Sequence, residues 1–255
     1  MADARPARLD LSRPRTYGEL FQASLQLFGR HADVLLTLAL LVVAPVTLII
    51  DGVWGRALAD GADANPPVAA QAVSAAASLF LILPLVTASS ALVVRNLGEG
   101  RAPSGVGPAL RAGAHAFPRV LGAVVLYAIA VLAGCVLLLL PGIWLAIRCY
   151  FAVQAAALEG DPPGGALRRS VELVRGQWWR TFGYLLGTGL LLGVAGSFAT
   201  TAFAASGSGP LFVAGTAVVE SVVLTITAIF ATLLYYDLRA RGATAPPAGA
   251  DTMAP

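Results

Sequence analysis

The amino-acid sequence predicts an all-α polytopic membrane protein: a bundle of six transmembrane helices with amphipathic helices at one membrane surface. Hydrophobic residues fill 57% of the 255 positions and charged residues only 12%, whereas about 25% is usual in a soluble domain. The apolar residues gather in six long runs, and the seventeen basic residues are all Arg and lie mostly between alternate runs. These three observations together indicate an integral membrane protein.

Six apolar runs set the expected spans. About 20 apolar residues are needed to cross the hydrocarbon core, and the absence of water there favours helices, which satisfy their own backbone groups. Pro45 lies inside the first run, and Pro84 is expected to kink the second. The expected spans cover about 34–53, 69–94, 120–140, 143–158, 181–203 and 211–236.

The arginines set the expected orientation. Fifteen of the seventeen fall in the chain ends and the loops on one side of this arrangement; the exceptions are Arg56 and Arg148. Because cytoplasmic loops carry the excess of basic residues, we expect a multi-pass protein of the cell membrane with both termini cytoplasmic. The six-span domain then covers 15–241, and the polar or Pro-rich ends, 1–14 and 242–255, are expected to be disordered.

Aromatic and amphipathic residues mark the expected membrane boundaries. Trp and Tyr favour the interface, so Trp178 and Trp179 are expected at the inner boundary and Trp144 at the outer one, with Trp54. Amphipathic stretches precede the first, third and fifth spans and suit the cytoplasmic surface; they cover 16–31, 107–119 and 164–180. This pattern fits three copies of one helix-plus-hairpin unit, but it equally fits ordinary loops before the odd-numbered spans.

Small residues in the fifth span predict close helix packing. The run "TFGYLLGTGLLLGVAGSFATTAF" carries two glycine stripes on different faces, and small residues allow helices to approach closely in lipid. We therefore expect the fifth span inside the bundle. The helix-packing candidates are Gly183, Gly187, Gly189, Gly193 and Gly196.

Two embedded charges form the candidate site. Pro141 and Gly142 are expected to turn the chain between the third and fourth spans, which places Arg148 roughly 9 Å inside the outer edge. Glu220 is expected at similar depth in the sixth span. An embedded Arg is costly without a partner, so we expect Arg148 and Glu220 to pair. The alternatives are that Arg148 snorkels to the surface or contacts an anion or lipid headgroup.

Three stretches carry a family resemblance. "LPGIWLAIRCYFAVQAAALEG", "GALRRSVELVRGQWWRTFGYLL" and "ATLLYYDLRAR" occur in that order. They resemble the bacterial glycerophosphoryl diester phosphodiesterase membrane-domain family, and the likeness extends over about 16–241. The resemblance implies a six-span membrane domain of uncharacterised function. This chain has no room for the catalytic phosphodiesterase domain that some relatives carry beside it, so the family name implies no activity here.

The residues also argue against several functions. His31 and His115 are the only histidines, Lys is absent, and no HExxH or phosphate-loop motif occurs, so we expect no enzyme and no metal or cofactor. The net charge of +3 does not indicate nucleic acid. The expected role is a non-catalytic membrane module whose partners are membrane lipids or another membrane protein. The alternative is a small transporter, favoured by polar stripes in the second and sixth spans.

Overall fold

The structure is a computed structural model that describes residues 13–59, 68–101 and 105–244. All regular structure in these ranges is helical, which confirms the all-α class. The elements are α1 (Tyr17–Arg30), α2 (Ala32–Ala59), α3 (Val68–Ala77), the π-helical η1 (Ser78–Ile82), α4 (Leu83–Gly98), α5 (Val106–Leu137), α6 (Leu139–Cys149), α7 (Ala152–Leu158), α8 (Pro163–Val174), α9 (Trp178–Ala204) and α10 (Gly209–Thr244).

Six stretches of the described residues are long and apolar enough to cross a membrane, in the order expected. They are Ala32–Ile49, Ala75–Gly98, Val106–Leu137, Leu139–Leu158, Trp178–Ala204 and Gly209–Gly242. The residues expected to be disordered at 1–12 and 245–255 lie outside the described ranges. Residues 242–244 continue α10, so this helix passes the expected domain boundary at 241.

Helices α1 and α8 are separate amphipathic helices, as expected, whereas the third one is not separate. Residues 107–119 are the first turns of α5, which runs unbroken for 32 residues, about 48 Å. Pro118 lies inside this helix without ending it. A proline removes only one backbone bond, which a long helix in a packed bundle can tolerate.

The second span departs from regular α-helical geometry next to its proline. The π-helical segment Ser78–Ile82 joins α3 to α4, and Pro84 lies in the first turn of α4. A proline has no N–H to donate to the preceding turn, and the wider π turn accommodates that missing bond.

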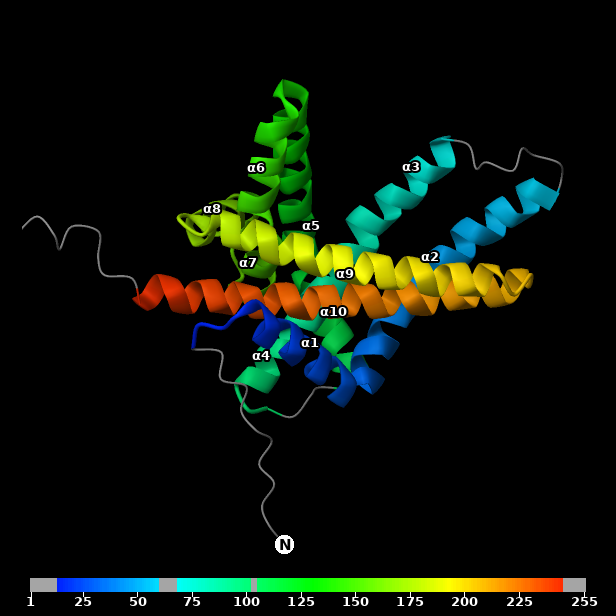
Figure 1. The fold of residues 1–255 in the computed structure, drawn as a ribbon, viewed down its shortest axis with the longest axis horizontal. Coiled ribbons are helices and arrows are strands. Elements are labelled where there is room, and N and C mark those ends of the chain that lie inside the picture. Colours follow the sequence, from blue (N-terminus) through cyan, green and yellow to red (C-terminus); the bar gives the residue numbers. More distant parts are fainter. Residues whose placement is uncertain (1–12, 60–67, 102–104, 245–255) are drawn as a thin grey trace, which may run out of the picture.

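The helices share one core and then separate as hairpins. Helix α10 packs against α2, α4, α9 and α1, and α7 packs against α4, α5 and α8. The largest fully buried side chains of this core include Tyr235, Phe151, Phe230 and Leu20. From there the α5–α6 hairpin and the α9–α10 hairpin extend in different directions (Figure 1). The outer parts of these hairpins therefore have few neighbours.

The turn between the third and fourth spans comes earlier than expected. The chain reverses at Leu138, whose backbone is extended (φ −167°, ψ 149°), and Pro141 and Gly142 both lie inside α6. Proline is accepted in the first turn of a helix, where its missing N–H has no partner to lose. Gly142 instead serves packing: a Cβ on it would lie 2.9 Å from the backbone nitrogen of Cys135 on α5.

The fifth span lies at the edge of the molecule, not inside it. Helix α9 has the smallest buried share of the six candidate spans. Only two of the five candidate glycines face a neighbour: Gly187 meets the Tyr17 hydroxyl at 3.3 Å, and Gly196 meets Val223 of α10 at 3.3 Å. The other three, Gly183, Gly189 and Gly193, have nothing within 4 Å. The expectation was wrong because small residues allow another helix to pack closely but do not determine whether a helix lies there.

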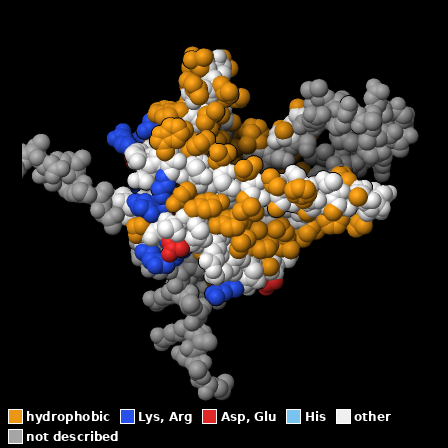
Figure 2. Space-filling view, in the orientation of Figure 1, with side chains coloured by type: hydrophobic (Ala, Val, Ile, Leu, Met, Phe, Trp, Pro, Cys, Tyr) orange, Lys and Arg blue, Asp and Glu red, His pale blue; other side chains and the backbone are white. Residues whose placement is uncertain are grey.

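Polarity divides the surface. Apolar side chains cover the α5–α6 tip and much of α9, while arginines gather toward α8 and the C-terminal part of α10 (Figure 2). Val136, Leu140 and Phe198 are 86%, 78% and 75% exposed, respectively. Apolar exposure on this scale suits contact with lipid.

Candidate functional site

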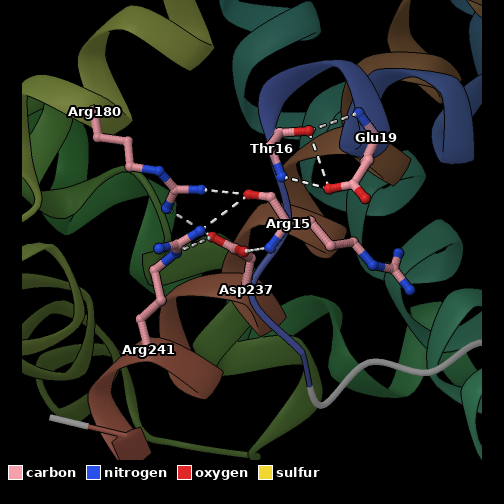
Figure 3. Close-up of polar contacts among 6 residues, drawn as sticks. All are labelled: Arg15, Thr16, Glu19, Arg180, Asp237 and Arg241. Carbon is pink, nitrogen blue, oxygen red and sulfur yellow. Dashed lines mark hydrogen bonds and ion pairs between the residues drawn. The ribbon is translucent and has the colours of Figure 1, made fainter.

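A buried carboxylate, Asp237, connects three distant segments at the arginine-rich end (Figure 3). Its side chain is 1% exposed. One oxygen accepts from Arg180 Nη1 of α9 at 2.7 Å and from Arg241 Nε at 3.1 Å, and the other accepts from the backbone N–H of Arg15 at 2.6 Å. A carboxylate this buried needs such partners.

The same arginines also hold the chain before α1. Arg180 Nη2 donates to the Arg15 carbonyl at 2.7 Å, and Arg241 Nη2 donates to it at 3.1 Å. Both backbone groups of Arg15 are therefore engaged. We call the group formed by Arg15, Arg180, Asp237 and Arg241 the Asp237 clamp.

A capping box starts α1 next to this clamp. The Thr16 side chain accepts from Glu19 N, and Thr16 N donates to Glu19 Oε2 at 2.8 Å, which satisfies two donors that the helix leaves open. The hydrogen bonds from the Thr16 backbone and then from its hydroxyl hold the pKa of the Glu19 carboxyl below its usual value. The start of α1 is therefore defined by its own residues.

Aromatic rings then fix α1 to the last hairpin. The Tyr17 ring lies 5.3 Å from Tyr184 of α9 and 5.8 Å from Phe230 of α10, both edge-on. Thr188 donates to the Tyr17 hydroxyl at 3.4 Å, and the Arg180 guanidinium lies 4.5 Å from the Tyr184 ring centroid. Edge-to-face pairs contribute about 0.5–1.5 kcal/mol each beyond area burial.

A second carboxylate, Glu159, gathers charges at the end of α7. It pairs with Arg169 of α8 at 3.2 Å and with Arg239 of α10 at 3.1 Å. The buried Tyr235 donates its hydroxyl to the same carboxylate. Glu159 therefore joins α7, α8 and α10.

Carbonyls beside Glu159 accept from two further arginines. Arg95, at the end of α4, donates to the Leu158 carbonyl at 3.3 Å, and Arg119 of α5 donates to the Gly160 carbonyl at 3.4 Å. Gly160 has a positive φ of 75°, a conformation that glycine adopts without strain. The corner after α7 is thus surrounded by guanidinium groups from four other helices.

A basic cavity of about 450 Å³ lies between α8 and the end of α10. Arg175 has no acidic partner in the described part of the chain. Glu172, which lies three residues before it, pairs with Arg168 at 3.7 Å instead. We call this cavity the basic pocket. It is lined by Arg169, Glu172, Leu173, Arg175, Gln177, Leu238, Arg239, Arg241 and Gly242.

Arg148 lies at the inner end of α6, level with α8. The helix breaks at Tyr150 and Phe151, and Ser170 of α8 bridges the break: its hydroxyl donates to the Arg148 carbonyl at 2.7 Å and accepts from the Phe151 N–H at 3.0 Å. Ten residues of helix separate Arg148 from the turn at Leu138, about 15 Å. It is thus farther from the turn than the expected distance of roughly 9 Å and lies close to the arginine-rich end.

The expected pair of Arg148 with Glu220 is not formed. The Arg148 guanidinium lies over the Trp144 ring, 4.3 Å from its centroid, and α6 packs against α5, α8 and α9. Glu220 is fifteen residues along α10 from Tyr235, about 22 Å, toward the opposite end of that helix. The pair does not form because α6 packs Arg148 beside α8, whereas Glu220 lies in the half of α10 that is far from α8.

The tryptophan boundaries need a related correction. Trp178 Nε1 donates to the Trp144 carbonyl at 3.3 Å, so these two residues lie at the same level and not at opposite faces of the membrane. The side chain of Trp54 lies outside the described residues. Trp144, Trp178 and Trp179 instead line one apolar cavity of about 370 Å³, together with Leu140 and Ile143.

A family model described as a domain of unknown function (DUF7847) matches residues 87–238. The chain belongs to the DUF7847 family. The match runs from the middle of α4 to the end of the buried part of α10, so it includes Glu159, Ser170, Arg180 and Asp237. Neither curated proteins nor solved structures give a match to this chain. No comparison ties it to the phosphodiesterase membrane-domain family.

The two cysteines of this DUF7847 chain are free: Cys135 is exposed and Cys149 is buried. Over the described residues, no group of three or more His, Cys, Asp or Glu side chains could hold a metal ion. The chemistry of the site is therefore that of guanidinium groups, carboxylates and indole rings.

Asp237, Glu159 and Ser170 were missed because the sequence alone gives them no special signal. Each is a polar residue at the edge of an apolar run, where charges normally face solvent. A usable hint was the need of so many arginines for acceptors: "YYDLRAR" places one carboxylate near them and "ALEGD" places two. Apart from Arg241, which is four residues from Asp237, their partners lie 10 to 222 residues away, beyond the reach of local patterns.

Proposed function

We propose that this chain is a non-catalytic integral protein of the cell membrane that binds anionic lipid headgroups in the basic pocket. The observation that carries the proposal is the arginine excess there. Four arginines and a single glutamate line the cavity between α8 and α10, next to surfaces that suit lipid. A phosphate group would supply the charge that this lining lacks.

The pocket arginines are positioned by carboxylates without being fully neutralised by them. Arg169 and Arg239 share Glu159, and Arg241 shares Asp237 with Arg180. Each carboxylate thus serves two guanidinium groups, which leaves net positive charge. Guanidinium groups bind phosphate oxygens in a fixed fork geometry, so a preformed set of them suits a phosphate headgroup.

The proposed orientation places this pocket at the cytoplasmic leaflet. Fifteen arginines share one side in the sequence, and basic residues favour the cytoplasm. That leaflet carries the anionic lipids that attract basic segments, by about 1 kcal/mol per Lys or Arg. Both chain termini would then be cytoplasmic.

The arrangement also supports a role without catalysis. Asp237 and Glu159, the best buried carboxylates described, each accept from two arginines. Both carboxylates are thus occupied by ion pairs that hold the helices together. Binding is the chemistry that such a set of groups performs best.

The broader relationship to the phosphodiesterase membrane-domain family remains part of this proposal. The stretches that carry the resemblance include the Glu159 corner, α8 and the start of α9, and the Asp237 segment of α10. These are the segments that build the basic pocket. If the two families are related, headgroup binding is a role that a membrane domain without its phosphodiesterase partner could keep.

A small transporter is the second candidate. Pro45 inside α2, the π-helical η1 and the buried Thr216 hydroxyl, which has no partner in the described part of the chain, are features that a moving bundle could use. A transporter needs a polar site near the membrane midplane. The basic pocket lies between α8 and the end of α10, and the apolar cavity lies between α6 and the start of α9, which favours lipid binding.

Lipid retention by matched variants tests the proposal. The full chain in mild detergent is mixed with phosphatidylglycerol or phosphatidylcholine of the same acyl chains, and native mass spectrometry measures the bound lipid. Arg175→Gln should weaken phosphatidylglycerol binding about 5- to 10-fold, the loss of one charge-assisted contact. Arg168→Gln, the same change on α8 but outside the pocket, should change it less than twofold. Equal effects of the two variants contradict the proposal.

Two further measurements separate the competing explanations. Inorganic phosphate and glycerol phosphate at millimolar concentration should not displace the lipid if the acyl chains contribute to binding; displacement would indicate a soluble anion as ligand. Reconstituted vesicles that accumulate a soluble solute only when the protein is present would favour the transporter.

A further inference from the structure

We propose a second lipid site, distinct from the basic pocket, in the apolar cavity between α6 and α9. Its occupant is one acyl chain of an anionic phospholipid whose phosphate lies on Arg148. We call this cavity the tryptophan cleft. The inference rests on the proposed function only in that the chain lies in a membrane; it does not need the basic pocket to bind anything.

The cleft forms because two hairpins separate. Helices α6 and α9 meet near their inner ends, where Trp178 Nε1 donates to the Trp144 carbonyl, and then extend in different directions (Figure 1). Leu140, Ile143 and Trp144 form one wall, and Trp178 and Trp179 form the other. The walls are almost wholly apolar, and the volume of about 370 Å³ is within the range of small-molecule sites.

The cleft is open to the surface that lipid would contact. Leu140 and Trp179 are each 78% exposed, and Trp144 is 46% exposed. Such large apolar side chains around a hollow normally mark a binding site for an apolar ligand. The indole donor of Trp178 is already used on the Trp144 carbonyl, so this wall offers shape and apolar area to an occupant.

Arg148 supplies a charge at one end of the cleft. Its guanidinium lies over the Trp144 ring, and no carboxylate among the described residues pairs with it. The contact with the indole face is worth about 0.5–1 kcal/mol where water has access and leaves the guanidinium N–H groups at its rim available. An anionic headgroup complements this charge.

The order of side chains along α6 matches that of a phospholipid. Arg148, Trp144 and Leu140 follow one another at four-residue spacing, so they share a helix face, and Ile143 lies beside them. The guanidinium comes first, then an indole ring suited to the interface, then aliphatic side chains. Arg148 and Leu140 are eight residues apart, about 12 Å.

The level of Arg148 also fits a headgroup. Ser170 of α8 fixes the Arg148 carbonyl, and the neighbours of Ser170 on that amphipathic helix are Arg168 and Arg169. A phosphate at Arg148 would therefore lie beside α8, and its acyl chain would extend from there along α6 toward the tip at Leu138. A partner protein helix would need only the apolar wall and would leave Arg148 unused.

The first test is lipid retention by the full chain in mild detergent, measured by native mass spectrometry. Wild type should retain phosphatidylglycerol at two sites, and Arg148→Gln should weaken one binding step at least fivefold while leaving phosphatidylcholine retention within twofold. Arg148→Lys should keep most of the preference. Arg175→Gln should affect the other step, so either proposal can fail alone. Unchanged phosphatidylglycerol retention in Arg148→Gln overturns the tryptophan cleft site.

The second test fills the cleft without touching its charge. Ile143→Trp should reduce retention at this site for both lipids at least fivefold, and a phosphatidylglycerol with a photoreactive group in mid-chain should crosslink to Leu140, Ile143 or Trp179 in wild type only. The variant retains every polar contact of Arg148, so it decides the question even if Arg148→Gln fails to fold. Crosslinks confined to other helices, or a co-purifying polypeptide in the cleft, contradict the proposal.

Discussion

Asp237 of α10 and Arg180 of α9 meet at 2.7 Å, and the same carboxylate accepts the backbone N–H of Arg15 from before α1. This one side chain therefore sets how the N-terminal segment lies against the last hairpin. It is 1% exposed, whereas Arg180 is 18% exposed, so the pair is protected from water on the carboxylate side.

Removing the charge of Asp237 should destabilise the protein strongly. Asp237→Asn leaves Arg180 and Arg241 without their carboxylate, and breaking a buried pair by removing one partner typically costs about 3–5 kcal/mol. The free energy of unfolding, measured by titration with a denaturing detergent, should fall by about that amount. Glu172→Gln, which breaks the exposed pair with Arg168, should cost less than about 1 kcal/mol. Similar losses in both variants would contradict the clamp.

Loss of the Ser170 hydroxyl should lower the free energy of unfolding more than loss of an exposed hydroxyl does. Ser170→Ala removes the acceptor for the Phe151 N–H and the donor to the Arg148 carbonyl at the break between α6 and α7. Leaving buried backbone groups without partners costs about 1–3 kcal/mol. The control is Ser197→Ala on α9, whose exposed hydroxyl bonds only its own helix at Gly193; its loss should change the free energy of unfolding by less than 0.5 kcal/mol, roughly the effect of a surface substitution.

Two glycine substitutions should have opposite effects. A methyl group at Gly142 would lie 2.9 Å from the backbone of Cys135, whereas one at Gly189 would meet nothing within 4 Å. Gly142→Ala should therefore cost about 1–3 kcal/mol through overpacking. Gly189→Ala should be neutral or stabilise by up to about 1 kcal/mol, because alanine is the better helix former. Thermal midpoints in detergent test this, and a loss in Gly189→Ala would mean that α9 has a close neighbour there.

Membrane orientation should be readable from single cysteines. In a chain with Cys135→Ser and Cys149→Ala, Ser208→Cys at the α9–α10 turn should react with an impermeant maleimide on intact cells. Arg168→Cys on α8 should react only after the membrane is opened. The reverse pattern would place the arginine-rich end outside and contradict the cytoplasmic termini.

The sequence predicted the spans well because the length of an apolar run decides whether it can cross a membrane. All six runs became helical, and Pro84 marked the π-helical segment of the second, since both features depend on neighbouring residues. The amphipathic α1 and α8 were equally local. Residues 107–119 were read as a separate helix because their arginines suggested a surface position, but nothing between 119 and 120 stops α5.

The site was harder to predict because its partners are distant in the chain. Gly193 and Gly196 look alike in sequence, yet only Gly196 meets α10. Arg148 was expected to face Glu220, but α6 ends one residue after it and packs on α8, where Ser170, twenty-two residues further on, bonds its carbonyl. Asp237 depends on Arg15, more than two hundred residues earlier, and no periodicity encodes that contact.

The Asp237 clamp joins the first and last segments of the folded domain. Arg15, at the entry to α1, and Arg241, in the last turns of α10, are direct neighbours, although 226 positions separate them. A circularly permuted chain, opened at the turn after Ala204 and rejoined by a short linker between its present ends, would keep every contact described here. The first and last elements can therefore assemble only after synthesis has reached α10. Until then the segment before α1 lacks the partners that hold it in the folded domain.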